Sequence, residues 1–378
     1  MRRFVMAMAA SVAVLTPGVM ALGTGAASAS PTRAIYVSPH GKPFKSGRSC
    51  LTARYSSINK AIRAAPPGGT VIVCRGTYFT QAVVAKPLRL IGLAGAVINA
   101  KGQKPLPGLP VPGGSGVVVI ATRHVLVRGF VVVNAKFDGI LVARSAFVEV
   151  SHNILANNGD NNSGVGVDFN GTSFSLADHN LAKFNSGGGF LVADDLGRTG
   201  HDAIAWNEAT RNPGGCGVII AGHSTAGVTS NLVAHNLLTY NGTSKKSPGA
   251  GVVIATEVPR ETVADNTVLD NVIYGNGLAG VTIHAHLRNQ HMNGNQIVGN
   301  DIGTNNTVGD PIDLGPPVIN KPDLRTTGIL VGSSSRIKVL ISHNYIHDNF
   351  YGIFIEGRVH ATLIKNRFRR VVVPVRFV

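Results

Sequence analysis

The chain has 378 residues, of which 14% are charged, and a formal net charge of +16. This length allows two ordinary domains or one long repetitive domain, and beyond the N-terminus the absence of about 18 consecutive apolar residues excludes a transmembrane helix. Residues 31–137 contain 15 Lys or Arg and no Asp or Glu, whereas residues 138–356 contain 12 basic and 19 acidic residues. Such a basic protein should attract polyanions, unless the charge serves only solubility or retention in a cell wall.

Residues 1–29 have the pattern of a secretory signal peptide. Arg2 and Arg3 give a positive start, an apolar stretch follows, and residues 27–29 read Ala-Ser-Ala, a small-residue cleavage site. We therefore predict a secreted, extracellular protein. Its mature chain, residues 30–378, is expected to form one domain.

Three cysteines follow the signal peptide. Export makes disulfides chemically accessible. Cys50 and Cys74 flank a predicted helix and strand near the mature N-terminus, and we expect them to form a disulfide. Cys216 stands alone in GGCGVII, and we interpret it as a small buried apolar residue.

Residues 30–70 are predicted to form an N-terminal cap containing one short helix. Ser56 or Ser57 is the expected N-cap, and Pro66-Pro67-Gly68 ends the helix. One face of this helix is apolar and consists of Ile58, Ala61, Ile62 and Ala65. Strands are expected next at 71–74, 88–92 and 116–121.

From residue 139 onwards the chain is repetitive, and each repeat opens with Gly and a run of alternating β-branched residues. The openings are GILVA (139), GVGVDF (164), GFLVAD (189), GVIIAGH (217), GVVIATE (251), GVTIHAH (280), GILVGS (328) and GIFIEG (352). Repeats of roughly 20–45 residues indicate a solenoid. The alternation with a period of two excludes helical repeats.

The predicted fold is all-β, a parallel β-helix of roughly ten coils. Residues one and three positions after each Gly, such as Val218 and Ile220, should point into the core, and those two and four positions after it should point outward. Two long steps between repeats carry loops, at 242–250 and 309–323.

The opening of the mature chain resembles a known superfamily. YSSINKAIRAAPPGGTVIVCRGTY, followed by VVAKPLRLIG and AVINA, is similar to secreted right-handed parallel β-helix proteins of the pectate-lyase-like superfamily. The resemblance covers nearly the whole mature chain and implies the handedness of the coil. It says little about activity, since the scaffold hosts lyases, hydrolases, epimerases and adhesins. Thr80-Gln81 replaces an acidic residue often found after the Gly-Thr-Tyr.

Because coils stack in register, columns of outward residues matter more than linear motifs. Aligned on the opening Gly, the residues four positions on are Ala143, Asp168, Ala193, Ala221, Ala255, His284, Gly332 and Glu356. Six positions on, successive coils carry Asp195, His223, Glu257 and His286. A floor of small side chains beside alternating acids and imidazoles is typical of a groove that holds and cuts a sugar chain. The structural alternative is that opposite charges alternate to avoid like-charge stacking.

Two mechanisms fit the candidate catalytic residues Asp195, His223 and Glu257. In a lyase or epimerase, His223 would remove the proton α to a uronate carboxylate, which Arg198 or Arg260 would neutralise. In an inverting hydrolase, Asp195 and Glu257 would divide the acid and base roles, since two rungs separate their backbones by roughly 9.6 Å. The candidate substrate-binding residues are Asp168, Asp194, Arg198, Arg260, His284 and His286.

Other site types find weaker support. Polygalacturonase-type hydrolases have a similar order of motifs, which here would be Asp168, Asp194-Asp195, Gly222-His223-Ser224 and Arg336-Ile337-Lys338. In this chain, however, the motifs are separated by too many coils. His284, His286 and His291 are read as surface histidines, so no metal site is assigned. The cofactor stays unknown; calcium would need clustered carboxylates, for which Asp194-Asp195 or Asp310 with Asp313 are the candidates.

An asparagine phrase recurs along the chain. It appears as VSHNILANNG (150–159), ADHNLAKFNSG (177–187), AHNLLTYNG (234–242), ADNTVLDN (264–271) and SHNYIHDN (342–349). We interpret it as scaffolding, in which side-chain amides bond from coil to coil and tolerate left-handed turns. The asparagines concerned are Asn153, Asn180, Asn236 and Asn344, and the preceding His152, His179, His235 and His343 receive no catalytic role.

The sequence thus predicts a secreted β-helix that binds an acidic polysaccharide or cell-wall polymer and, as an enzyme, cleaves or isomerises it. The alternative is a non-catalytic extracellular binding or structural protein. One Trp and few exposed aromatic residues argue against nucleic acid as a partner. We expect a monomer.

Overall fold

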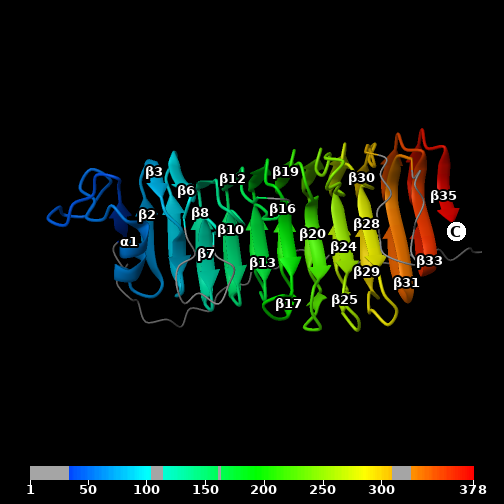
Figure 1. Cartoon of the computed structure of the whole chain (residues 1–378), viewed down its shortest axis with the longest axis horizontal. Helices are drawn as coiled ribbons and strands as arrows, with labels where there is room; N and C mark the ends of the chain where they lie inside the picture. Colours follow the sequence, from blue (N-terminus) through cyan, green and yellow to red (C-terminus); the bar gives the residue numbers. More distant parts are fainter. Residues whose placement is uncertain (1–33, 104–113, 161–162, 309–324) are drawn as a thin grey trace, which may run out of the picture. The chain divides into compact units, whose positions relative to one another are not determined.

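Each coil of the chain places one strand on each of three faces, and each strand pairs in parallel with its counterpart in the next coil. In the computed structural model, which describes residues 34–103, 114–160, 163–308 and 325–378, strands β7, β10, β13, β16 and β20 follow one another in this way (Figure 1). Among the described residues the third face contains 11 strands, in agreement with the roughly ten coils expected. The fold is therefore the predicted all-β parallel β-helix.

The first two faces are joined by two long strands near the C-terminus, β31 (Thr327–Ser342) and β33 (Tyr351–Ile364), which belong to both. The first face otherwise consists of β4 (Ala82–Val84), β7 (Val117–Ile120), β10 (Ile140–Ala143), β13 (Val167–Asn170), β16 (Gly188–Ala193), β20 (Cys216–Gly222), β24 (Val252–Thr256), β28 (Val281–Ala285) and β35 (Val373–Phe377). The second face otherwise consists of β1 (Ile35–Val37), β2 (Gly69–Val73), β5 (Leu88–Gly92), β8 (Arg123–Arg128), β11 (Ala146–Ser151), β14 (Leu176–Asp178), β18 (Ala203–Ala205), β22 (Leu232–Ala234), β26 (Thr267–Leu269) and β29 (Asn295–Val298).

The third face consists of β3 (Gly76–Phe79), β6 (Ala96–Asn99), β9 (Val131–Val133), β12 (Ile154–Ala156), β15 (Leu181–Lys183), β19 (Glu208–Thr210), β23 (Leu237–Thr239), β27 (Val272–Tyr274), β30 (Asp301–Ile302), β32 (Tyr345–His347) and β34 (Arg367–Arg369). Three short strands, β17 (Thr199–Gly200), β21 (Val228–Thr229) and β25 (Val263–Ala264), form a small additional sheet. This sheet lies in the chain between the first and second faces, close to the candidate site.

The interior is filled by the alternating apolar residues, as the repeat predicts. Val218 and Ile220 are 0% exposed, and the corresponding residues of the other coils belong to the same core cluster. The outward residues are less open than expected. On β10, for example, Leu141 and Ala143 are buried in a second apolar cluster outside the first face.

The asparagine phrase does form ladders, and there are two within each phrase. Asn153 donates from Nδ2 to Oδ1 of Asn180 in the next coil, at 3.0 Å, and its backbone N–H donates to the same oxygen. The second asparagine of the phrase, Asn158, bonds to Asn185 in the same way. These amides are buried and satisfy backbone groups at the corners of the coils, which is what a buried polar side chain requires.

One detail of the ladder differs from the expectation. The left-handed backbone belongs to the residue before the asparagine, with φ of 56° at His152, 53° at His179 and 56° at His235. The ladder asparagines that follow these histidines do not have positive φ, whereas Asn157, the residue before Asn158, does, with φ of 56°. The histidines therefore take the sharp turn and point outward, while the asparagine side chain folds back into the stack.

At the N-terminal end, helix α1 (Ile58–Ala64) forms where the sequence predicts it. Its N-cap is Ser57, whose side chain accepts a hydrogen bond from the N–H of Lys60, and its buried face packs against β1, β2 and β4. That this helix caps the first coil stays a prediction.

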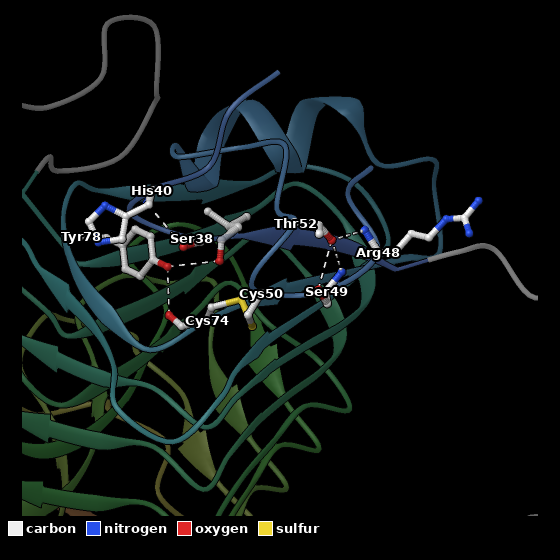
Figure 2. The surroundings of a disulfide bond; sticks show 9 residues. Ser38, His40, Arg48, Ser49, Cys50, Thr52, Cys74 and Tyr78 are labelled. Atoms are coloured by element: carbon white, nitrogen blue, oxygen red, sulfur yellow. Dashed lines mark hydrogen bonds between the residues drawn. A yellow bond between two sulfur atoms is a disulfide. The ribbon is translucent and has the colours of Figure 1, made fainter. Parts of the chain in front are cut away.

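Beside this helix, the disulfide between Cys50 and Cys74 fastens the preceding loop to the end of β2 (Figure 2). The hydroxyl of Tyr78 donates toward the carbonyls of Cys74, at 2.9 Å, and Val37, at 3.2 Å. Burial raises the pKa of Tyr78 to about 12, so its donating proton is kept throughout the physiological pH range. Cys216 is a free, buried thiol.

Several expectations concern segments outside the described residues. These are the signal peptide at 1–29, the loop at 309–323 and the carboxylate pair Asp310 and Asp313. The loop at 242–250 is described, and the backbone N–H of Ala250 at its end donates to Sγ of Cys216. Within the described part of the chain, no helix has the length and apolar character needed to cross a membrane.

Candidate functional site

The centre of the candidate site is a hydrogen-bonded pair formed by His223 and Asp195 from neighbouring coils. Nδ1 of His223 lies 3.0 Å from both carboxylate oxygens of Asp195. The two side chains are partly open to solvent, with 29% of His223 and 46% of Asp195 exposed. The hydrogen bond that Asp195 accepts, reinforced by its charge and by that of Glu257, raises the pKa of His223, and the same hydrogen bond lowers the pKa of Asp195.

A third side chain fixes Asp195 from the opposite direction. Nδ2 of Asn170 donates to Asp195 Oδ2 at 2.9 Å, and Oδ1 of Asn170 accepts the N–H of Leu196 at 2.8 Å. The carbonyl of Leu196 accepts a hydrogen bond from Nε of Arg144 at 3.1 Å. One network thus runs across four coils from Arg144 to His223.

Asp194, expected to contact substrate, is instead a structural residue. It is 1% exposed, and its carboxylate accepts the N–H groups of His223 at 2.7 Å and Gly227 at 2.7 Å. It also accepts both the N–H and the hydroxyl of Ser224. Asp194 therefore holds the turn that carries His223, and we remove it from the substrate-binding set.

Glu261 performs a similar role under the neighbouring turn. It is 0% exposed, and its Oε2 accepts the N–H groups of Glu257 at 2.5 Å and Val258 at 3.0 Å. Burial, together with the charge of Asp194, raises the pKa of Glu261 to about 7. A side chain at Gly222 would come within 2.7 Å of the Glu261 carboxyl group, so glycine is required beside His223. Glu257 itself is exposed at the surface of this turn.

Asp168 lies on β13, but not at the rung that the Gly alignment assigned to it. The structure pairs Asp168 with Leu141 and Leu191, whereas Asn170 pairs with Ala143 and Ala193. The second Gly of GVGVDF, not the first, is equivalent to the other opening glycines, so the alignment was wrong by two residues for this coil. Asn170 is therefore the residue in line with the alanine column.

The Asp168 carboxyl group is almost enclosed. It is 7% exposed, and its Oδ1 has no hydrogen-bond partner. Burial raises its pKa well above the ordinary value, and the charges of Asp138 and Asp195 add to the shift. The environment thus favours a protonated, neutral Asp168 close to the charged Asp195, with little surface for direct substrate contact.

The remaining predicted residues are not brought to the His223 pair by any hydrogen bond in the described part of the chain. Arg198 is exposed and its Nη2 donates to Oγ1 of Thr229 at 3.3 Å, and Arg260 is an exposed turn residue with φ of 63°. His284 is only 8% exposed, and burial lowers its pKa well below the ordinary value. Its ring contacts that of His286 edge-on, at 4.7 Å.

The expected open floor of small residues is not found. Ala193, Ala221 and Ala255 do form one column, but they are 0%, 3% and 6% exposed. An open groove of about 570 Å³ lies instead at the turns that follow β7, β10 and β13. Its lining includes Arg123 and Arg144.

Sequence reasoning missed Arg144 and the role of Asn170. Arg144 lies two positions before β11, and no sequence motif marks it as a functional residue. The contact between Arg144 and Leu196 spans 52 residues, and only correct register across the intervening coil reveals it. The alignment on Gly164 set Asn170 in the same column as Asp195, whereas the structure pairs Asn170 with Ala193, and its side chain reaches the Asp195 carboxylate from that rung.

Comparison with known proteins places this geometry in a structural context. No family profile and no curated protein sequence matches the chain. Among solved structures, the A-module of a mannuronan C-5 epimerase from Azotobacter vinelandii matches with a TM-score of 0.60 and 18% identity, over 85% of this chain and 92% of that one. The fold is the right-handed parallel β-helix. A pectate lyase matches this β-helix with a TM-score of 0.55 and 15% identity, over 89% of this chain and 78% of that one.

The same β-helix fold also occurs in a protein that is not named as a lyase or an epimerase. A surface adhesin of Streptococcus pneumoniae matches with a TM-score of 0.56 and 13% identity, over 84% of this chain and 88% of that one. At these identities the likeness concerns the fold alone. Function has to be argued from the side chains of the site.

Proposed function

We propose that this protein is an exported enzyme that binds an acidic polysaccharide and removes the proton α to a uronate carboxylate, as a lyase or an epimerase does. The observation that carries the proposal is the pair formed by His223 and Asp195, 3.0 Å apart and partly open to solvent. A carboxylate that holds Nδ1 of an imidazole fixes the ring orientation and increases its basicity.

The chemistry assigns a separate role to each member of the network. Asp195 is a positioning residue: its bond to Nδ1 leaves Nε2 of His223 to take the proton from the uronate ring. The electron pair of the broken C–H bond then expels the neighbouring glycosidic oxygen in a lyase, or takes up a proton on the opposite face of the ring in an epimerase. Asn170 keeps the Asp195 carboxylate in place throughout.

The charges around the pair suit an anionic chain. Arg123 and Arg144 line the groove at the turns after β7, β10 and β13, and Arg144 is tied by Leu196 to the Asp195 turn. We assign to Arg144, rather than to Arg198 or Arg260, the neutralisation of the substrate carboxylate. This neutralisation is needed because loss of the α proton places further negative charge on the same group.

An inverting hydrolase is supported less well by the same residues. That mechanism needs one carboxyl group that stays protonated to act as the general acid. The hydrogen bond to His223 lowers the pKa of Asp195 instead, which keeps Asp195 charged and suits it only to the base role, so the acid role would fall to Glu257, whose side chain is exposed to solvent. The division of acid and base roles between Asp195 and Glu257 is therefore not part of our proposal.

The test is a screen of the purified mature protein on uronate polymers, with and without added calcium. Absorbance detects unsaturated lyase products, new reducing ends detect cleavage of any kind, and NMR of the polymer detects epimerised residues. We expect one of these signals from the wild type and its loss in His223→Ala. His343→Ala, which alters an exposed histidine in a turn between the second and third faces, should behave as the wild type.

The non-catalytic alternative makes a different prediction for the same samples. The basic segment 31–137 and the arginine-lined groove could attract an acidic polymer without any reaction. In that case the wild type would bind the polymers and leave them chemically unchanged. Binding that persists in His223→Ala but weakens in Arg144→Ala, with no product from the wild type, would replace our proposal by this alternative.

A further inference from the structure

A second cluster of reactive side chains lies at the turns that carry the asparagine ladder, between the second and third faces. Four aromatic side chains stack there from coil to coil. His152 lies 4.9 Å from His179, His179 lies 6.1 Å from Trp206, and Trp206 lies 5.1 Å from His235, measured between ring centroids. All four have left-handed backbone conformations, so their side chains project outward side by side.

At one end of this stack a carboxylate lies close to two imidazoles. Oδ2 of Asp178 lies 2.8 Å from Nδ1 of His179. One ligand atom from each of His152, Asp178 and His179 lies within 4.8 Å of the other two, the only such group of three among the residues that the structure describes. The second oxygen of Asp178, Oδ1, is buried and has no hydrogen-bond partner.

We propose that His152, Asp178 and His179 bind one divalent transition-metal ion, with Zn²⁺ as the best fit. Two imidazole nitrogens and one carboxylate are ligands that Zn²⁺ accepts in tetrahedral sites, with water in the fourth position. Nitrogen ligands disfavour calcium and magnesium, which prefer sites made of oxygen.

The ladder beneath supplies the rigidity that such a site needs. Asn153 and Asn180 follow directly after the two histidines and are joined by two hydrogen bonds of 3.0 Å. The backbones that carry His152 and His179 are therefore held at a fixed separation. Only the two exposed histidine side chains and the partly buried Asp178 carboxylate have to adjust when the ion binds, so little ordering cost opposes binding.

Packing alone does not account for the carboxylate. A parallel stack on the preceding turns, made of His124, Phe147, Phe174 and His201, has similar spacings of 4.9–5.4 Å. In the described residues that stack provides no group of three metal ligands. Rings therefore stack in this protein without forming a three-ligand group, and in the described residues Asp178 completes such a group on one stack only.

The experiment uses Trp206, the single tryptophan of the chain, as a built-in reporter. Its ring stacks on His179, so a paramagnetic ion bound at the site should quench its fluorescence. Full-length mature protein without a histidine tag is titrated with Cu²⁺ by fluorescence and with Zn²⁺ by calorimetry. We expect one bound ion, quenching by Cu²⁺ that Zn²⁺ competes away, and a rise in the thermal midpoint with Zn²⁺.

Three variants decide the assignment. His152→Ala and Asp178→Asn should each weaken Zn²⁺ binding by about tenfold or more while keeping the wild-type fold by circular dichroism. His235→Ala, which removes the ring on the other side of Trp206, should bind Zn²⁺ as tightly as the wild type. The proposal is overturned if the wild type binds no Zn²⁺, if both ligand variants bind it like the wild type, or if His235→Ala loses binding to the same extent.

Discussion

Asp202 is the one acidic residue in a third ladder of buried polar side chains, and replacing it by Asn should change how stability depends on pH. It is 1% exposed; its Oδ1 accepts the N–H of Ser175 and its Oδ2 accepts the hydroxyl of Thr172. The next coils carry Asn231 and Asn266 at the equivalent rungs. An amide can donate onward to the next rung, whereas an ionised carboxylate cannot.

The size of this effect on stability follows from the pKa of Asp202. Burial raises the pKa of Asp202 from 3.8 to about 7. The folded state therefore holds the proton more tightly than the unfolded state, and stability falls as the pH rises through this window. This increase in the pKa of Asp202 corresponds to about 4 kcal/mol of folding stability, which is lost between about pH 4 and pH 7. Asp202→Asn should remove this loss, and above pH 7 the variant should be more stable than the wild type by up to that amount.

Denaturant unfolding of both proteins at pH 4.5 and pH 8, followed by circular dichroism, measures the effect. The difference in unfolding free energy between the two proteins cancels the contributions of other titrating groups. These include Asp138 and Glu261, whose pKa values are also raised by burial. Asp265→Asn, at an exposed site, serves as the control and should leave the pH dependence unchanged. The reasoning is refuted if Asp202→Asn and the wild type lose the same stability between the two pH values.

Three further predictions concern the site and its support. Asp195→Asn should lower the pKa of His223, so that the acidic limb of the pH profile of kcat/KM moves to lower pH while kcat falls about 100-fold or more; an unchanged limb would contradict the pairing. Asp194→Ala should cost about 3 kcal/mol in denaturant unfolding, because several donors lose a buried charged acceptor. Reducing the disulfide between Cys50 and Cys74, 24 residues apart, should lower stability by about 3 kcal/mol, and an unaltered unfolding midpoint would show that the tie is dispensable.

Much of the fold could be predicted because the pattern that specifies it is local and repeated. Alternation such as that of Val218 and Ile220 determines which side faces the core, and every coil repeats it. The ladders were visible for the same reason, since buried asparagine is costly unless each rung finds a partner in the next coil. Left-handed turns at His152 and His179 were not anticipated, because the neighbouring asparagines, with their short polar side chains, were the expected residues for that conformation.

The site could be predicted only in part, because it depends on register and on distant contacts. The pairing of His223 with Asp195 followed from counting along well-aligned strands. In the coil of Asp168 two glycines, 164 and 166, were available, and no local pattern distinguished the one that opens the strand. The burial of individual acidic residues could not be predicted either. Nothing in the sequence distinguishes Asp194, which is enclosed by a turn, from its exposed neighbour Asp195.

The central claim, that His223 abstracts the proton α to a uronate carboxylate, is tested most directly by isotope exchange. Wild type and His223→Gln are incubated in D₂O with the uronate polymer that the protein binds, and NMR follows the signal of the proton at that carbon. We predict that the wild type replaces this proton by deuterium or removes it in an unsaturated product, and that His223→Gln does neither. A wild type that leaves the signal intact, or a variant that exchanges it at the wild-type rate, would contradict the claim.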